Sequence, residues 1–400
     1  MNGTLKFQLS TLFFLQFFIW GSWYVTLGTY LLQTLEFNGR EVGLIYGATA
    51  IAATVSPFLS GILADRLFST EKILSVLHFS GGLVMFYIST LQEFALFYPL
   101  LIFYSLLYMP TFALASALTF FHVSDSTKDF PKVRVWGTIG WIIAGLVVSY
   151  LQIEAEASPM QISAGSSLVM AFYCFFLPKT PPQAQQNRLT LKTIIGPEII
   201  DLLKQRRFFI LILCMALIAI PSGFYYSFTN PFLNEIGVSN AAGKMSIGQI
   251  SEIVLMLLLP WFFARIRFKW IIAMGLFVWG FRYALFAMGD SADDMALLYF
   301  SIILHGIAYG FSFLTTQIYV DRIVPPQIRS TAQGFITLIT MGFGVLAGSY
   351  FAGEVVKWYT FADGTHNWQA IWLIPAIFGG AVTILFLVLF KDKDHEKRPI

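Results

Sequence analysis

The stretch Pro178-Lys-Thr-Pro-Pro-Gln-Ala-Gln-Gln-Asn-Arg188 opens the longest polar segment of the chain, which continues to Arg207. Its prolines and amides interrupt any apolar periodicity, and its basic residues are typical of a loop on the cytoplasmic side of a membrane. On each side lie about six apolar runs, each near the 20 residues that a helix needs to cross a bilayer. The segment therefore predicts a central cytoplasmic linker between two halves.

The composition indicates that the bilayer is the main solvent of this chain. Hydrophobic residues make up 57% and charged residues only 12%, whereas roughly a quarter of residues are charged in soluble domains. The first apolar run, 7–35, is too long for a signal peptide. We predict an all-α polytopic membrane protein with about 12 transmembrane helices in two six-helix bundles. The expected divisions are 1–178, the first bundle; 179–207, the linker; 208–390, the second bundle; and 391–400, a cytoplasmic tail.

The positions of basic residues predict the orientation, because Lys and Arg are retained on the cytoplasmic side. With both termini inside, the external loops hold only Arg40, Lys244 and Lys357 and are otherwise acidic. The net charge of +3 is thus a signature of topology, and we expect the partners to be lipid and a small solute, without nucleic acid.

Sequence motifs of enzymes are missing. We find no phosphate loop, HExxH pair or nucleophile elbow, and Cys174 and Cys214 lie in apolar runs without the spacing of metal ligands. We therefore predict a protein that is not an enzyme and that carries no cofactor or metal.

A weak internal symmetry supports the division into two halves. Arg134-Val-Trp-Gly-Thr-Ile-Gly140 and Arg329-Ser-Thr-Ala-Gln-Gly334 enter helices at equivalent places. After the second run, Gly61-Ile-Leu-Ala-Asp65-Arg66 resembles the loop signature of the major facilitator superfamily. That resemblance implies two bundles that alternate access to a central site. Small residues are interpreted as packing residues in two runs: Gly43, Gly47, Ser56 and Gly61 in the second, and Gly334, Gly342, Gly344 and Gly348 in the eleventh.

Charges deep in membrane helices are functional candidates, because they are costly there. Only Glu252 and Arg282 lie well inside expected spans, with Arg134 near the inner end of another. One interpretation is a buried ion pair of Glu252 and Arg282 that only fixes two helices. The other is that Glu252 accepts the transported proton beside the Arg282 cation.

Polar and aromatic residues recur at helical spacing, and such stripes must face protein or water. They suit a neutral polyhydroxylated ligand with a flat ring. Their tryptophans and tyrosines, Tyr226 included, could instead anchor helix ends, and His305 could be a satisfied interior histidine. The stripes are Arg134, Thr138 and Trp141; Gln249 and Glu252; His305, Tyr309, Ser312 and Thr316; and Gln16, Trp20 and Trp23.

Several segments, in order along the chain, resemble the bacterial nucleoside:proton symporters of the major facilitator superfamily. They are Phe14-Leu-Gln-Phe17, Trp20-Gly-Ser-Trp23, Tyr108-Met-Pro-Thr111, Arg134 to Gly140, Gln249-Ile-Ser-Glu252, Arg282-Tyr-Ala-Leu-Phe-Ala287 and Ile328 to Gly334.

The resemblance implies which residues meet the nucleoside. It assigns Arg134, Thr138 and Trp141 in the first half, and Gln249 and Glu252 in the second. This chain departs from the family pattern at two places. In the seventh run the family has a Gln and an Asn, and this chain has Gly223 and Tyr226. In the tenth run the family has a Tyr and then an aromatic residue followed by Asp, and this chain has His305, Tyr309 and Gly310. The missing carboxylate leaves Glu252, beside Arg282, as the expected proton carrier.

We therefore expect a monomeric importer of nucleosides, driven by protons, in the bacterial inner membrane with both termini cytoplasmic. A proton-coupled transporter of sugars or sugar derivatives is an alternative, because ribose and sugars use the same donors. An efflux pump and a non-transporting receptor are further alternatives.

Overall fold

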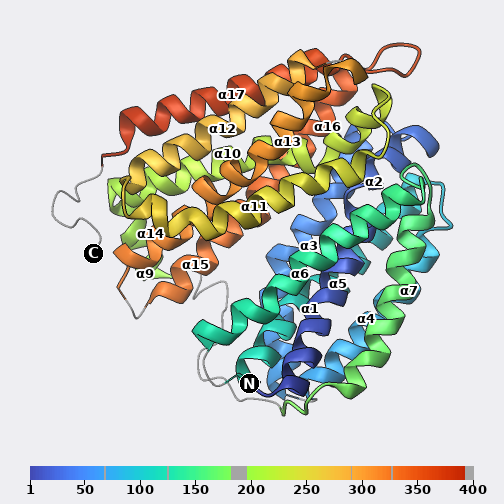
Figure 1. Ribbon diagram of the computed structural model, residues 1–400, viewed down its shortest axis with the longest axis vertical. Coiled ribbons are helices and arrows are strands. Elements are labelled where there is room, and N and C mark those ends of the chain that lie inside the picture. The colour runs from blue at the N-terminus through green and yellow to red at the C-terminus, as the bar shows by residue number, and fades with distance from the viewer. Residues whose placement is uncertain (67–68, 124–125, 182–195, 290, 326–327, 392–400) are drawn as a thin grey trace. The chain divides into compact units, whose positions relative to one another are not determined.

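The structure is a computed structural model that describes the chain except residues 67–68, 124–125, 182–195, 290, 326–327 and 392–400. It divides into two compact units, Met1–Leu189 and Thr190–Ile400. The first unit (Figure 1, blue to green) contains α1 (Gly3–Tyr24), α2 (Leu27–Thr29), η1 (Tyr30–Thr34), α3 (Gly39–Arg66), α4 (Thr70–Ile88), α5 (Phe94–His122), α6 (Ser126–Tyr150), α7 (Ser158–Tyr173) and η2 (Cys174–Phe176).

The second unit (Figure 1, lime to red) begins with the short amphipathic helix α9 (Pro197–Lys204). It continues with α10 (Arg206–Glu235), α11 (Ala241–Phe263), α12 (Phe268–Met288), η3 (Ala292–Asp294), α13 (Met295–Tyr309), the π-helical η4 (Gly310–Leu314), α14 (Thr315–Ile323), α15 (Arg329–Thr337), the π-helical η6 (Leu338–Gly344), α16 (Val345–Trp358) and α17 (Trp368–Leu389).

The prediction of an all-α polytopic membrane protein is confirmed. Among the described residues, 11 helical segments are long and apolar enough to cross a bilayer, and α3 adds another long helix of 28 residues. No strand occurs in the described parts of the chain. The side chains of residues 57–66, and with them the Asp65-Arg66 signature, lie outside the described residues.

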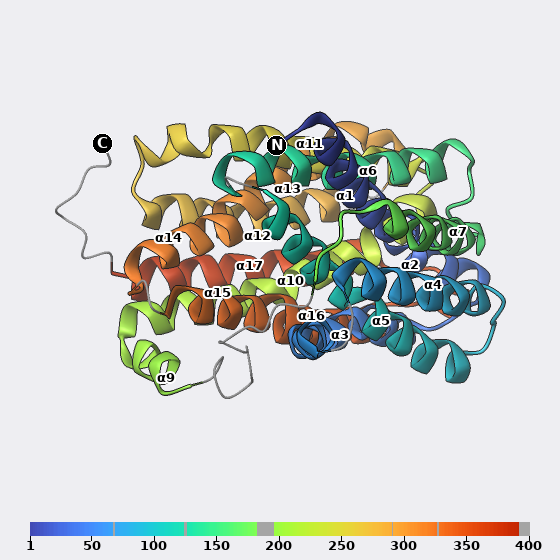
Figure 2. The ribbon, with the colours of Figure 1, turned by 90° about the horizontal axis from the view of Figure 1, so that it is seen from below.

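Both units use the same packing plan. In the first, α1 packs on α6, α3 on α5, and α4 on α7; in the second, α10 packs on α16, α11 on α13, and α12 on α17 (Figures 1 and 2). Each pair joins helices at equivalent places along its own half. The internal symmetry of the sequence therefore corresponds to a repeated three-dimensional arrangement.

Glycines allow these helix pairs to approach closely. A Cβ at Gly140 of α6 would overlap the Phe14 carbonyl oxygen of α1. At the equivalent place in the second unit, a Cβ at Gly348 of α16 would lie 2.5 Å from the Ile220 carbonyl oxygen of α10. A Cβ at Gly344 would lie 2.5 Å from the Ala219 Cβ. Gly344 and Gly348 are thus packing residues, as the sequence predicted. Gly334 is not, because nothing lies within 4 Å of its Cβ position.

We expect Gly140→Ala to destabilise the protein by about 1–3 kcal/mol, since the added methyl group must displace backbone. Thermal unfolding in detergent measures the change. Gly165→Ala on α7 is the matched control, because a Cβ there meets nothing within 4 Å, and it should leave the unfolding temperature unchanged or slightly raised. Equal unfolding temperatures for the two variants would contradict the packing role of Gly140.

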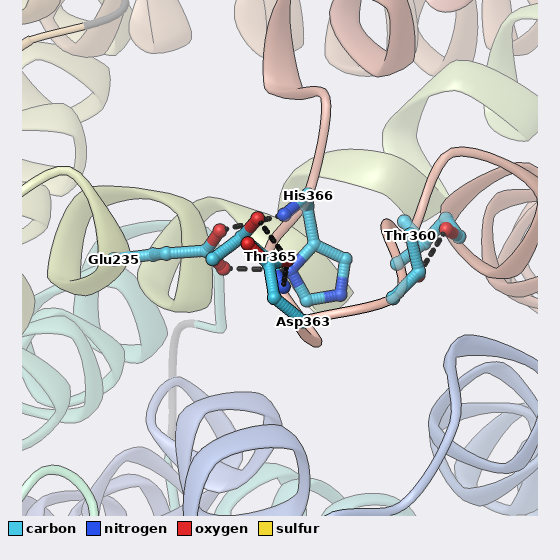
Figure 3. A network of polar contacts seen from close by, with 6 residues as sticks. Glu235, Thr360, Asp363, Thr365 and His366 are labelled. Carbon is cyan, nitrogen blue, oxygen red and sulfur yellow. Dashed lines mark hydrogen bonds and ion pairs between the residues drawn. The ribbon is translucent and has the colours of Figure 1, made fainter.

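One polar network ties a loop to the end of a long helix in the second unit (Figure 3). Glu235, the last residue of α10, accepts hydrogen bonds from His366 N at 2.9 Å and pairs with His366 Nδ1 at 2.7 Å. In the same loop Asp363 accepts from the Thr365 amide and hydroxyl, and these bonds lower the pKa of Asp363. The connection between α16 and α17 is therefore fixed to α10.

Candidate functional site

Arg134, on α6, lies half-buried against the aromatic face of α1. Its guanidinium carbon is 4.1 Å from the Phe17 ring centroid and 5.8 Å from that of Phe13. Gly137 makes room for this arrangement, because a Cβ there would lie 2.7 Å from Phe17 Cδ2 and 2.8 Å from Arg134 Nη1. The Phe17 ring stabilises the Arg134 guanidinium through a cation–π contact. The planar guanidinium thereby presents its N–H donors in a defined direction.

Thr138 and Trp141 continue the same face of α6, and both are half-buried. The Trp141 ring meets Trp20 edge-on at 5.3 Å and Tyr24 at 6.3 Å. Trp20 in turn lies 5.1 Å from Phe112 of α5. The first unit thus brings a cation, a hydroxyl and a supported indole together on one helix face, as their spacing predicted.

Gln16 has a different environment from the one that the sequence suggested. It is fully buried and is held on three sides: its amide donates to Thr111 Oγ1 at 2.6 Å, its side-chain oxygen pairs with His78 Nε2 at 3.1 Å, and its carbonyl accepts from the Tyr108 hydroxyl. Trp23 is also buried, against Tyr104. Of that stripe only Trp20 keeps part of its surface exposed, because hydrogen-bonding partners on α4 and α5 draw Gln16 into the core.

In the second unit, α11 carries Gln249 and Glu252 one turn apart, both half-buried. The helix is held tightly against α13. A Cβ at Gly306 would lie 2.6 Å from the Glu252 amide nitrogen, and the Gly306 amide donates to Ser251 Oγ at 3.1 Å. The backbone that presents Glu252 is therefore fixed to the helix that presents His305.

Arg282, on α12, is fully buried, and it is bonded to a histidine side chain. Its Nη1 donates to His305 Nδ1 at 2.7 Å. Its guanidinium carbon lies 4.0 Å from the Tyr225 ring centroid and 5.4 Å from that of Trp279. The Nε and Nη2 atoms make no hydrogen bond within the described part of the chain. Aromatic faces thus supply much of the stabilisation of this buried cation.

His305 lies at the centre of an aromatic group. Tyr225 stacks on it at 4.7 Å, Tyr226 meets it edge-on at 6.2 Å, and Tyr309 lies one turn along α13 at 6.2 Å. Tyr226 and Tyr309 are half-buried. Tyr226 belongs to a continuous α10 and is not the helix-end anchor that was the alternative interpretation.

The stripe expected beyond Tyr309 is interrupted. The π-helical turn η4 adds a residue to the helical turn and changes the direction of the side chains after it. Ser312 is buried and accepts from Trp279 Nε1 at 3.1 Å, and Thr316 is buried beside Met215. These two side chains are therefore structural, and only His305 and Tyr309 stay in the aromatic group.

Three residues of the second unit were missed or misread in the sequence. Trp279 lies one turn from Arg282, a spacing that could have identified it. Glu354 on α16 is a strongly buried carboxylate, as are Glu71 and Glu154 of the first unit, and its position near a helix end concealed it. Gly223 packs on α16, since a Cβ there would lie 2.5 Å from Gly348 C, so it marks a close helix contact.

These observations define the class of protein: a membrane transporter of the major facilitator superfamily, with two equivalent helical units that each carry polar and aromatic residues within their spans. No group of His, Cys, Asp and Glu among the described residues could hold a metal ion.

Comparison with known proteins defines the family. The family model described as Nucleoside H+ symporter matches residues 3–395, and the chain belongs to this family. It is 40% identical to YegT of Escherichia coli K12, over 97% of this chain and 94% of that one. It is 33% identical to the nucleoside permease NupG (99% and 98%) and 31% identical to the xanthosine permease (98% of each) of the same organism. A crystal structure of NupG superposes with a TM-score of 0.90, covering 98% of this chain and all of that chain.

Proposed function

We propose that Arg134, Thr138 and Trp141 in the first unit, and Tyr226, Gln249, Glu252, His305 and Tyr309 in the second, contact the nucleoside that this proton-coupled transporter imports. The observation that carries the proposal is the pairing, in each unit, of hydrogen-bonding side chains with half-buried aromatic rings. A nucleoside needs both, because its base offers a flat face and its ribose offers hydroxyl groups. Trp141 and Tyr309 would stack on the base, and the polar side chains would bind ribose or base edges.

The family and its transporter relatives confirm that the protein is not an enzyme and exclude the alternative of a non-transporting receptor. Within the family the preferred nucleoside is tested by competition. Uptake of labelled uridine should be inhibited by unlabelled nucleosides and unaffected by free sugars. Inhibition by sugars alone would refute the proposal in favour of sugar transport.

We further propose that the protein acts as a monomer in the bacterial inner membrane with both termini cytoplasmic. The support for the orientation is the charge asymmetry: the segment between the two units is rich in Lys and Arg, whereas the loop before α13 holds Asp293 and Asp294. Basic loops are retained inside.

Cysteine labelling tests this orientation. In a background without Cys174 and Cys214, both buried, a cysteine at Asp201 on α9 should be protected from a membrane-impermeant thiol reagent added outside intact cells. A cysteine at Asp293, also exposed, should react. After permeabilisation both should react, which controls for access. The reverse pattern would overturn the orientation.

A further inference from the structure

The hydrogen bond between Arg282 and His305 fixes where the imidazole carries its proton. Both side chains are buried, at 0% and 1% exposure, and Arg282 Nη1 lies 2.7 Å from His305 Nδ1. A guanidinium is always protonated and can only donate. His305 Nδ1 must therefore accept, which places the single proton of the neutral ring on Nε2.

The packing around His305 keeps the ring in this orientation. Tyr225 of α10 stacks on one face with an interplanar angle of 21°, and its own ring supports the Arg282 cation. On the α11 side, the backbone at Gly248 packs closely against α13, since a Cβ there would lie 3.2 Å from His305 Cβ. A flipped ring would put a C–H group against the guanidinium and lose the bond.

The titratable and charged groups around His305 come from four helices. They are Arg282 from α12, Tyr225 and Tyr226 from α10, Glu252 from α11, which interacts electrostatically with Tyr225, and Tyr309 from its own helix. Arg282 is the one in direct contact through a ring nitrogen. A second proton on His305 would have to enter at Nδ1, break this bond and place two cations face to face.

The other ring nitrogen, Nε2, is the one that carries the proton. Within the described part of the chain, no group accepts a hydrogen bond from His305 Nε2. His305 Nε2 is not among the fully buried side-chain atoms that lack a partner, so it keeps some accessible surface at which a ligand can supply the acceptor. Tyr226 and Tyr309, which flank the ring, are both proposed above to contact substrate.

We propose that Arg282 is a positioning residue that holds His305 as a permanently neutral Nε2–H donor, and that this donor binds a hydrogen-bond acceptor of the nucleoside. His305 then discriminates between ligands and does not carry the transported proton. The proposal rests on the assignment of this group to the substrate site.

Two substitutions separate this role from a structural one. In His305→Gln the amide nitrogen can reach the position of Nε2, whereas in His305→Asn the carbonyl oxygen can replace Nδ1 toward Arg282 but nothing replaces Nε2. We expect the Gln variant to bind uridine within about twofold of wild type and the Asn variant to bind about 3- to 10-fold more weakly, the scale of one neutral hydrogen bond. His366→Asn, at the histidine that pairs with Glu235, is the control and should bind normally.

The opposite order, with Asn closer to wild type than Gln, would overturn the proposal, because His305 would then serve only to satisfy Arg282. Both His305 variants should still accumulate uridine in response to an inward proton gradient. Loss of gradient-driven accumulation in both, with binding retained, would identify His305 as the proton carrier and equally overturn it.

A spectroscopic measurement tests the tautomer without substrate. In protein labelled with ¹⁵N-histidine, the signal that disappears in His305→Gln should show an unprotonated Nδ1 and a protonated Nε2 from about pH 5.5 to pH 8. A doubly protonated ring in that range would refute the tautomer. Failure of the wild-type protein to bind uridine would instead refute the proposed function while leaving this result intact.

Discussion

Arg134→Ala is expected to weaken uridine binding about 10- to 150-fold, because hydrogen bonds to a charged group each contribute roughly 1.5–3 kcal/mol. The guanidinium, supported on the Phe17 ring at 4.1 Å, presents its donors in one plane. Arg134→Lys should recover only a small part of the affinity, because a point charge reproduces neither the planar fork nor the stacking on Phe17.

Binding to purified protein in detergent measures these changes, and melting temperatures report whether the variants fold. Lys132→Ala is the matched control. Lys132 lies on the same helix, is 57% exposed and pairs with Asp129 at 3.1 Å, so its loss should leave binding unchanged. Wild-type affinity in Arg134→Ala would remove Arg134 from the site.

Glu252→Gln is expected to abolish accumulation driven by a proton gradient while leaving exchange of nucleoside intact. Glutamine resembles the protonated carboxyl and cannot release a proton. With one proton per nucleoside, each pH unit supports at most about tenfold accumulation. The wild type should therefore approach about 100-fold across two pH units, and the variant should stay near onefold. Proteoliposomes with an imposed gradient measure accumulation, and counterflow in the same vesicles measures exchange.

Glu354→Gln is the informative comparison, since Glu354 is the more deeply buried carboxylate, at 8% exposure. It should keep gradient-driven accumulation. If coupling is lost in Glu354→Gln and kept in Glu252→Gln, the proton carrier has been assigned to the wrong residue. If Glu252 only balances Arg282, Glu252→Gln should lower the folded yield and the double change with Arg282→Gln should restore it.

Much of the architecture could be predicted because the bilayer imposes strong constraints on sequence. Apolar runs of fixed length on both sides of the polar segment after Pro178 were sufficient for the fold, and the glycines at 344 and 348 were correctly interpreted as helix contacts. The stripe on α6 could be predicted because that helix is regular from Arg134 to Trp141.

The remaining site residues depend on contacts that no local pattern contains. Gln16 looked like a cavity residue until His78 and Thr111, far away in sequence, were seen to bind it. The cation of Arg282 seemed to need a carboxylate, but a histidine nitrogen and aromatic rings surround it. Ser312 and Thr316 were misplaced because helical spacing assumes an α-helix throughout.

The wide turn at Gly310–Leu314 has a mechanical consequence. It divides one membrane crossing into two rods, α13 with His305 and α14 with Tyr319, whose angular relation is set by a single surplus residue. The Gly310 carbonyl oxygen accepts hydrogen bonds from both the Thr315 amide and the Thr315 hydroxyl, the latter at 2.8 Å. These two bonds stabilise the wide turn at its C-terminal end. If the turn tightened to an α-helix, α14 would rotate by about 100° relative to α13, which would swing Thr316 away from Met215. A small change in the helical turn beside His305 and Tyr309 would thus cause a large rotation of α14, at the other end of the same crossing.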